Sequence, residues 1–195
     1  HELAKCGLTP NVRRVADPAF TLVPVAAAHK VGMELRGTLG VNLGPHLHVL
    51  TSGGDRSCWV RHCAETLRVL VGAVDRQVVL IPHVVNQQHE EPNCDFLFMQ
   101  EVAQLLRQEG ITLPVLPPTL TAAELKWAIG QLDAFIGSRM HSTIAAFGSG
   151  VPCGCVSYSA KASALCEVFY GDDALCIPCE RLDGPSLVKW AQSLL

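Results

Sequence analysis

Short apolar runs alternate with amphipathic stretches along the chain from residue 38 onward. The apolar runs, which predict strands, are residues 38–43, 77–82, 113–116, 134–137, 153–157 and 174–177. Hydrophobic residues at helical spacing predict helices over 58–73, 95–109, 121–131, 142–149, 160–169 and 185–194. This alternation is typical of βαβ units. It therefore predicts an α/β fold in which an open parallel sheet of about six strands carries helices on both faces.

Residues at the ends of two predicted helices support these boundaries. Asp95 is expected to cap the helix over 95–109, and Gly110 follows that helix where a C-cap glycine is commonly found. Thr121 followed by Glu124 has the sequence of a capping box, which opens the next helix. With right-handed crossovers between the strands, the expected domain is Rossmann-like.

The first 37 residues lack this periodicity. Pro24 and the small residues after it have the composition of a connector. We therefore expect residues 1–37 to be a connector or N-terminal segment and residues 38–195 to be one Rossmann-like domain. Because the chain begins with His1 rather than Met, we also expect it to be a piece of a longer, two-domain enzyme.

Composition narrows the class of protein. The chain has 49% hydrophobic residues, 17% charged residues and a formal net charge of -3, which suits one sizeable core. No run of Lys or Arg could neutralise a row of phosphates, so nucleic acid is not an expected partner. No apolar stretch approaches the roughly 20 residues of a membrane span, and no signal segment opens the chain. We expect a cytoplasmic protein.

Nine cysteines raise the question of metal binding. Cys176 and Cys179 have CxxC spacing, but no second CxxC or matched His pair lies at a finger-like distance. Cys153 and Cys155 alternate within a predicted strand and so point off the same face. Buried thiols are favoured over structural zinc, and we expect no metal. No GxGxxG follows the first strand, so no dinucleotide cofactor is indicated.

Polar residues follow three predicted strands at their C-terminal ends, where ligands bind in open parallel sheets. His83 follows the second strand and precedes a polar loop over 86–89, which a solvated loop would explain equally well. Tyr158 and Lys161 follow the fifth predicted strand and lead into a helix. A lone lysine in a first helical turn is usually only solvated. Only the residues near Lys161 therefore favour a functional role for it.

The central cluster is Ser138-Arg139-Met140-His141-Ser142, which leaves one strand and enters the next helix. A guanidinium donates a fork of hydrogen bonds that matches carboxylate or phosphate. The free N–H groups of a helix start favour an anion at the same place, and a histidine exchanges protons near neutral pH. The alternative is that Ser142 caps the helix, Arg139 pairs with a surface carboxylate and His141 is a satisfied loop histidine.

Taken together, these residues resemble the polysaccharide pyruvyl transferases. The run 133–152 followed by Tyr158-Ser-Ala-Lys161 carries the G-x-R-x-H-S, g-x-P and Y-x-x-K elements of that family. Ile81-Pro82-His83, Glu124-Leu125-Lys126 and Asp17-Pro18-Ala19-Phe20 also occur in the family's order. Ser159-Ala160 departs from the Asp-Pro that many members have before the lysine. The resemblance implies one half of a glycosyltransferase-B-like fold.

The resemblance implies transfer of a pyruvyl group from phosphoenolpyruvate to two sugar hydroxyls, giving a pyruvate ketal and phosphate. Arg139 would hold the donor anion, and His141 would act as general acid or stabilise the departing phosphate. His83, Ser138, Ser142, Tyr158 and Lys161 are the expected substrate-binding residues. No cofactor or metal is implied beyond the donor itself. The acceptor would be a saccharide or a lipid-linked saccharide, and the latter would bring peripheral contact with a membrane.

Two other functions fit the same pattern. A glycosyltransferase-B-type donor domain could hold the diphosphate of a nucleotide sugar with a histidine and a cation at these strand ends. A non-catalytic binding domain could retain the fold without turnover. Neither the acceptor sugar nor the oligomeric state follows from the sequence.

Overall fold

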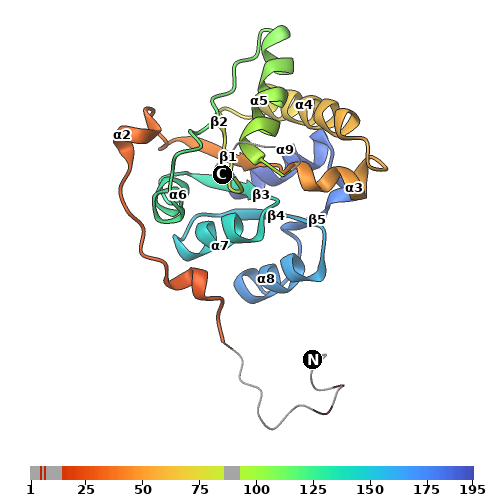
Figure 1. Ribbon diagram of the computed structural model, residues 1–195. Helices are drawn as coiled ribbons and strands as arrows, with labels where there is room; N and C mark the ends of the chain where they lie inside the picture. Colours follow the sequence, from red (N-terminus) through yellow and green to blue (C-terminus); the bar gives the residue numbers. More distant parts are fainter. Residues whose placement is uncertain (1–4, 6, 8–14, 86–92) are drawn as a thin grey trace.

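The sheet has five strands, all parallel, in the order β2-β1-β3-β4-β5 (Figure 1). The computed structural model describes residues 5, 7, 15–85 and 93–195. The strands in this part of the chain are β1 (Thr38–Asn42), β2 (Gln77–Leu80), β3 (Ala134–Gly137), β4 (Cys153–Ser157) and β5 (Cys176–Pro178). Helices lie on both faces of this open sheet, which confirms the predicted Rossmann-like α/β fold.

The predicted strand over residues 113–116 is wrong as a strand. It forms one isolated bridge, Leu80↔Val115, in which Leu80 donates its N–H to Pro114 at 2.9 Å and accepts from the N–H of Leu116 at 2.9 Å. To extend this ladder, the next hydrogen bond before the bridge would need an N–H from Pro114. The next one after the bridge would need an N–H from Pro118. Proline has no N–H to donate, so the ladder stops after a single rung.

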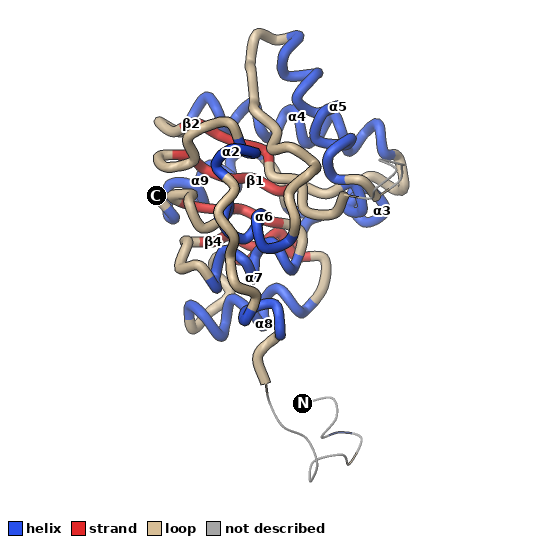
Figure 2. Tube along the Cα trace, turned by 60° about the vertical axis from the view of Figure 1, so that its left-hand side comes forward, coloured by secondary structure: helices blue, strands red, loops and turns tan. Residues whose placement is uncertain are grey.

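Two groups of helices cover the two faces of the sheet (Figures 1 and 2). One face carries α4 (Arg56–Ala73), α5 (Asp95–Gln108) and α9 (Gly184–Leu194); the other carries α6 (Ala122–Ile129), α7 (Met140–Gly148) and α8 (Ala160–Tyr170). The shorter elements are η1 (Pro18–Thr21), α2 (Ala28–Val31), η2 (Pro45–Leu47), α3 (His48–Thr51) and η3 (Cys179–Arg181). The predicted capping box of Thr121 and Glu124 is confirmed at the start of α6.

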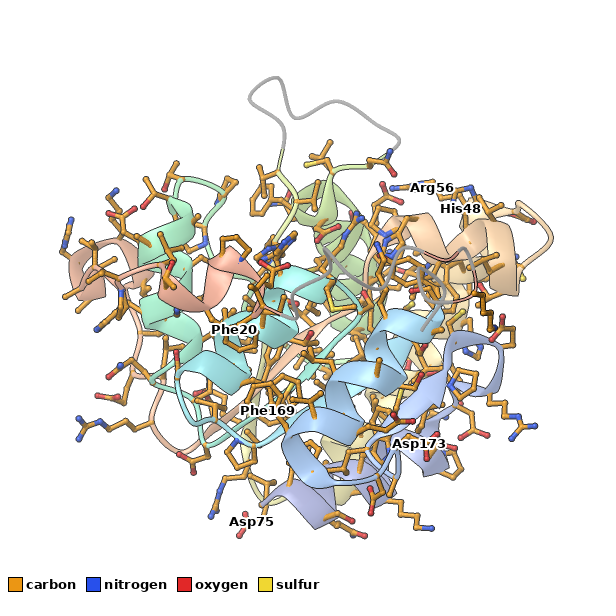
Figure 3. The ribbon with its side chains drawn as sticks, turned by 90° about the horizontal axis from the view of Figure 1, so that it is seen from below. Phe20, His48, Arg56, Asp75, Phe169 and Asp173 are labelled. Carbon is orange, nitrogen blue, oxygen red and sulfur yellow. The ribbon has the colours of Figure 1, made fainter. Side chains whose placement is uncertain are left out.

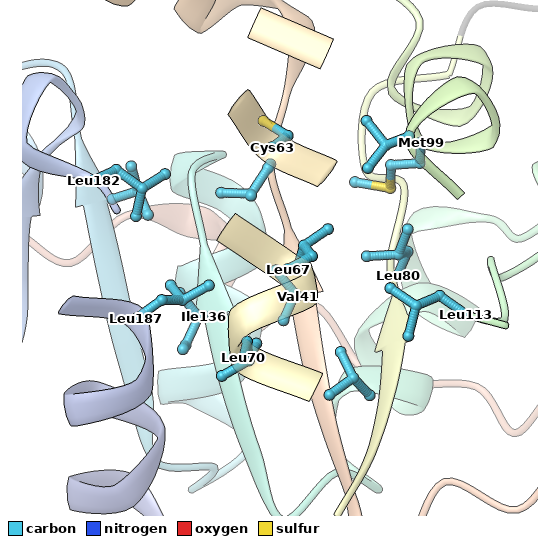
Figure 4. Close-up of a cluster of buried hydrophobic side chains, with 14 of the residues drawn as sticks. Val41, Cys63, Leu67, Leu70, Leu80, Met99, Leu113, Ile136, Leu182 and Leu187 are labelled. Atoms are coloured by element: carbon cyan, nitrogen blue, oxygen red, sulfur yellow. The ribbon is translucent and has the colours of Figure 1, made fainter. Parts of the chain in front are cut away.

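Alternating strand residues supply the two halves of the core. Val41, Leu80 and Ile136 point to the side of α4, where they pack near Leu67 and Leu70 (Figure 4). Each of these side chains is fully or almost fully buried, and burial of one such side chain contributes roughly 1.5–3 kcal/mol. The neighbouring strand positions point to the opposite side, towards α6, α7 and α8. Cys153 and Cys155 both face that side, as their spacing predicts.

The N-terminal segment packs against the second group of helices. Val25 donates its N–H to the carbonyl of Ala123 at 3.0 Å. The Lys126 side chain is 4% exposed, and its Nζ donates to the carbonyls of Ala19 and Phe20 at 3.3 and 3.0 Å. The Phe20 ring also stacks on Phe169 of α8, with centroids 5.5 Å apart (Figure 3). Residues 15–37 therefore contribute contacts to the domain that follows them.

The strand order creates a switch point between β1 and β3. From β1 the chain moves to β2 on one side and later returns to β3 on the other side of β1. Connections that leave β1 and β3 in opposite directions open a crevice at the carboxyl ends of these strands, which is where open α/β sheets bind ligands. The residues just beyond Asn42 and Gly137 occupy this place.

Candidate active site

Asn42 joins the ends of three strands. It is the last residue of β1 and is fully buried. Its Nδ2 donates to the Ile81 carbonyl at 2.9 Å and to Asp95 Oδ2 at 3.2 Å. Its Oδ1 accepts from Ser138 Oγ at 3.2 Å and from the Arg139 N–H at 3.0 Å. These four bonds use the full capacity of the amide and fix the loops after β2 and β3 relative to β1.

Asp95 places a buried carboxylate at the centre of this edge. It is 0% exposed and lies in the first turn of α5. Besides Asn42, the backbone N–H groups of His83 and Val84 donate to Oδ2 at 3.1 and 3.0 Å. The prediction that Asp95 caps the helix is wrong: the N-cap residue is Cys94, and no side chain caps there. The Asp95 oxygens are instead turned towards the ends of the strands.

Arg139 is held against this carboxylate. It is the N-cap residue of α7, and its Nε and Nη2 lie 3.1 and 2.7 Å from Asp95 Oδ1. Its side chain is 14% exposed, so the alternative of a surface ion pair is wrong: the partner is a fully buried carboxylate. Among the described residues, Nη1 has no hydrogen-bond partner. The pair thus orients the guanidinium and leaves one nitrogen for a ligand.

Two histidines lie beside this ion pair with unpartnered ring nitrogens. Both ring nitrogens of His46 and Nδ1 of His83 are buried and find no hydrogen-bond partner in the described part of the chain. Burial lowers the pKa of each imidazole to about 4, and for each the positive charge of Arg139 acts in the same direction, whereas Asp95 opposes it. Both rings are therefore neutral at neutral pH.

Gly44 permits the close packing of His46 and Arg139. A Cβ at this position would lie 2.5 Å from His46 Nδ1 and 3.0 Å from Arg139 Nε. The backbone of Gly44 is fixed as well, because its N–H donates to Ser138 Oγ at 2.9 Å and its carbonyl accepts from Trp59 Nε1 at 3.1 Å. A side chain here would push the imidazole or the guanidinium out of place.

The remaining predicted site residues divide by exposure. His141 is 62% exposed in the first turn of α7, with its Nε2 3.9 Å from Asp17 Oδ2. It lies two residues after Arg139, and its protonated form would lower the pKa of His83. Tyr158 is 43% exposed, and its ring meets that of His46 edge-on at 4.9 Å. Lys161 is exposed at the start of α8. His141 and Tyr158 therefore lie on the open side of the site, whereas contact of Lys161 with a ligand stays a prediction.

Ser138 and Ser142 are buried and are hydrogen-bonded to other residues of the protein. Ser138 is 3% exposed, donates to Asn42 and accepts from Gly44. Ser142 is 0% exposed, and its Oγ donates to the Arg139 carbonyl at 2.7 Å instead of capping the helix. Both hydroxyls hold the backbone around Arg139. Their contact with substrate stays a prediction.

Three residues of this site were missed by the sequence reasoning, namely Asn42, Asp95 and His46. His46 could have been found, because it lies in the loop after β1 at the same edge as His83 and Arg139. The polar loop that follows His83 (86–89) lies outside the described residues.

Comparison with models of known protein families gives a match. The family model of polysaccharide pyruvyl transferases matches residues 1–160 of the chain. The chain belongs to the polysaccharide pyruvyl transferase family. The family description implies a transferase with saccharide acceptors. Searches of curated proteins and of solved structures gave no match.

The sequence elements that suggested the pyruvyl transferase family fall into two places in the structure. Ile81-Pro82-His83 and Arg139-Met-His141 meet through Asp95, at the ends of β2 and β3. Asp17-Pro18-Ala19-Phe20 and Glu124-Leu125-Lys126 meet through the bonds of the Lys126 amine described above. The first pair of elements builds the candidate site, and the second attaches the N-terminal segment to α6.

Other features of the described residues bear on ligand binding. The eight cysteines in the described residues are free thiols, and these residues contain no group of three or more side chains arranged to bind a metal. Within the same residues, no helix is both long enough and apolar enough to cross a bilayer. A cavity of about 950 Å³ lies away from the strand ends, between α5 and residues 112–118.

Proposed function

We propose that this chain carries the donor site of a ketal pyruvyl transferase that uses phosphoenolpyruvate. The observation that carries the proposal is the convergence of Arg139 and His83 on the buried Asp95 at the switch point, with His141 in the first turn of the helix that begins after Arg139. Phosphoenolpyruvate brings a phosphate and a carboxylate. Such a ligand needs cationic and N–H donors at fixed positions, and the site provides both.

Arg139 acts as the fixed donor in this proposal. Two of its nitrogens bind Asp95, and Nη1 donates to an anionic oxygen of phosphoenolpyruvate. Because Asp95 offsets much of the guanidinium charge, Arg139 contributes to donor binding through the fixed position of its N–H groups more than through net charge. A hydrogen bond to a charged group contributes about 1.5–3 kcal/mol, which corresponds to roughly 10-fold to 100-fold in affinity.

His141 acts as the proton donor to the substrate. Its exposed ring can reach a ligand in the open part of the site. Protonation of the methylene carbon, C3, creates positive character at C2, where the first sugar hydroxyl attacks. The bond from C2 to the phosphate oxygen breaks, and the second hydroxyl closes the ketal. The two hydroxyl protons balance the reaction: one replaces the proton delivered to C3 and the other leaves with phosphate.

Calorimetric titration of phosphoenolpyruvate into the full chain tests the donor assignment. UDP-sugar and CMP-sugar serve as comparison ligands, and Arg139→Ala is the test variant. The matched control is Arg36→Ala, which removes an exposed arginine outside the site. We expect phosphoenolpyruvate to bind wild type and the control, and its affinity to fall at least 10-fold in Arg139→Ala. Preference for a nucleotide sugar would assign the site to a glycosyltransferase instead.

A further inference from the structure

His46 has no role in the reaction as described so far, although it lies within the site. It belongs to η2, directly after β1, and its ring contacts Gly44 on one side and Tyr158 on the other. Neither of its ring nitrogens has a hydrogen-bond partner among the described residues, and both are buried. His48, two residues later, differs: its Nδ1 is hydrogen-bonded to the Pro45 carbonyl at 2.7 Å.

Unpartnered buried nitrogens of this kind need a physical explanation. Most buried polar side-chain atoms in proteins are hydrogen-bonded, because a buried group without a partner loses its hydration and gains nothing. Both nitrogens of one ring are affected here, next to the guanidinium of Arg139. A ligand that supplied the missing partners would remove this cost on binding.

We infer that His46 is a substrate-contacting residue, whose ring donates a hydrogen bond to the anionic donor beside Arg139. The ligand class is a small anion with carboxylate or phosphate oxygens. This inference rests on the proposed function and adds to it a residue that neither the motif Arg139-Met-His141 nor the other predicted site residues include.

Access to His46 passes Tyr158. The imidazole nitrogens are buried, whereas the Tyr158 ring that meets the imidazole edge-on is 43% exposed. Tyr158 begins the loop that leads from β4 into α8, so its side chain can turn towards solvent without disturbing the sheet. The tyrosine thus borders the imidazole on the solvent side of the site.

Binding through His46 is linked to protons. The groups that face the ring are Arg139 from the start of α7, Asp95 from α5, His48 from α3 and Tyr158 from the loop before α8. In the free protein the pKa of His46 is about 4, and a bound anion raises it because it stabilises the charged imidazole. A group whose pKa rises on binding takes up protons, so the affinity through His46 increases as pH falls.

Two substitutions at His46 separate the hydrogen bond from the charge. His46→Phe keeps a flat ring and removes both nitrogens, whereas His46→Gln keeps an amide N–H that does not titrate. His29→Gln is the matched control, since His29 is exposed on α2. Each variant is titrated with phosphoenolpyruvate by calorimetry between about pH 5.5 and about pH 8, the range in which histidine commonly titrates.

The inference predicts a distinct pattern of affinities. His46→Phe should bind phosphoenolpyruvate roughly 10-fold to 100-fold more weakly than wild type, and the control should bind as wild type does. The affinity of His46→Gln for phosphoenolpyruvate should be within about 3-fold of the wild-type affinity at the alkaline end. It should become progressively weaker than the wild-type affinity as pH decreases. The phosphate of the ligand titrates equally in all variants, so only the differences between proteins carry the conclusion.

Three outcomes are decisive. If wild type binds phosphoenolpyruvate and both His46 variants bind it equally well at every pH, the role of His46 is overturned while the donor assignment stands. If wild type does not bind phosphoenolpyruvate, the donor assignment and the role of His46 are both overturned. If the variants do not fold, NMR titration of the His46 ring in wild type decides: phosphoenolpyruvate must raise its midpoint from about 4, and an unchanged midpoint overturns the inference.

Discussion

Replacing Asp95 by asparagine should destabilise the protein strongly. The carboxylate is fully buried and receives hydrogen bonds from Asn42, from the backbone of His83 and Val84, and from Arg139. Asparagine has the same shape but carries no charge, and its NH₂ group would face donors whichever way the amide is turned. The Arg139 side chain, 14% exposed, would keep a charge without its counter-ion.

The expected loss is about 3–5 kcal/mol, the usual cost of removing one partner from a buried ion pair. For a chain of this size it corresponds to a fall of about 6–20 °C in Tm. Urea unfolding followed by circular dichroism measures the loss. Glu101→Gln is the control, because Glu101 pairs with Arg56 at 2.6 Å but is 43% exposed, and such pairs contribute at most about 1 kcal/mol.

A double variant tests the reasoning behind this number. In Asp95→Asn/Arg139→Met the unpaired guanidinium is absent, so the double variant should be more stable than the sum of the two single losses predicts. The expected coupling is roughly 0.5–3 kcal/mol. Strictly additive losses, or an Asp95→Asn protein as stable as the Glu101→Gln control, would refute the central position given to this ion pair.

Further predictions concern the rest of the fold. Hydrogen bonds from Lys30 and Thr121 lower the pKa of Glu124 to about 2 from an ordinary value of 4.5. This contribution to stability is present above about pH 4.5 and is lost as pH falls towards 2. Glu124→Gln should therefore lower the midpoint of urea unfolding at neutral pH, and the difference from wild type should vanish in acid. Gly40→Ala should cost about 1–3 kcal/mol, because a Cβ would lie 2.5 Å from Leu132 Cδ1. In Gly72→Ala, where nothing lies within 4 Å of the added Cβ, stability should instead rise by up to about 1 kcal/mol in thermal unfolding. Cys58 is exposed, whereas burial raises the pKa of the Cys63 thiol, so Cys58→Ser should remove one rapidly reacting equivalent in a thiol titration, and Cys63→Ser should remove none.

Local patterns predicted most of the strands and helices, because burial of alternate positions shapes the sequence of each element directly. The exception was 113–116, an apolar run whose neighbouring prolines prevent a ladder. The run alone gives the expected composition of a strand. The failure becomes visible only when the register with Leu80 shows which N–H groups the ladder would need. Register depends on the partner strand, which the local pattern does not contain.

The candidate site could likewise be predicted only in part. Parallel strands end at one edge, so His83 and Arg139 could be placed together from the sequence alone. The partner of Arg139 could not, because Asp95 is 44 residues away in the chain and its position resembles an ordinary helix start. Asn42 likewise ends an apolar run without any local sign that it bonds to two other loops. Such roles depend on burial, and burial is decided by the whole fold.

The N-terminal segment shows the same limit. Residues 15–37 lack periodicity. They contact the domain through the backbone bond of Val25 and through single side chains such as Lys126 and Phe169. A buried lysine amine bound to two carbonyls has no periodic signature. The order of the elements can therefore be predicted from the local pattern, but the attachment of this segment cannot.

A crystal structure of the chain with phosphoenolpyruvate tests the central claim most directly. We predict electron density for the ligand at the carboxyl ends of β1 and β3, with an anionic oxygen within hydrogen-bonding distance of Arg139 Nη1 and of the His46 ring. Density in the cavity between α5 and residues 112–118, with Arg139 and His46 untouched, would contradict the account.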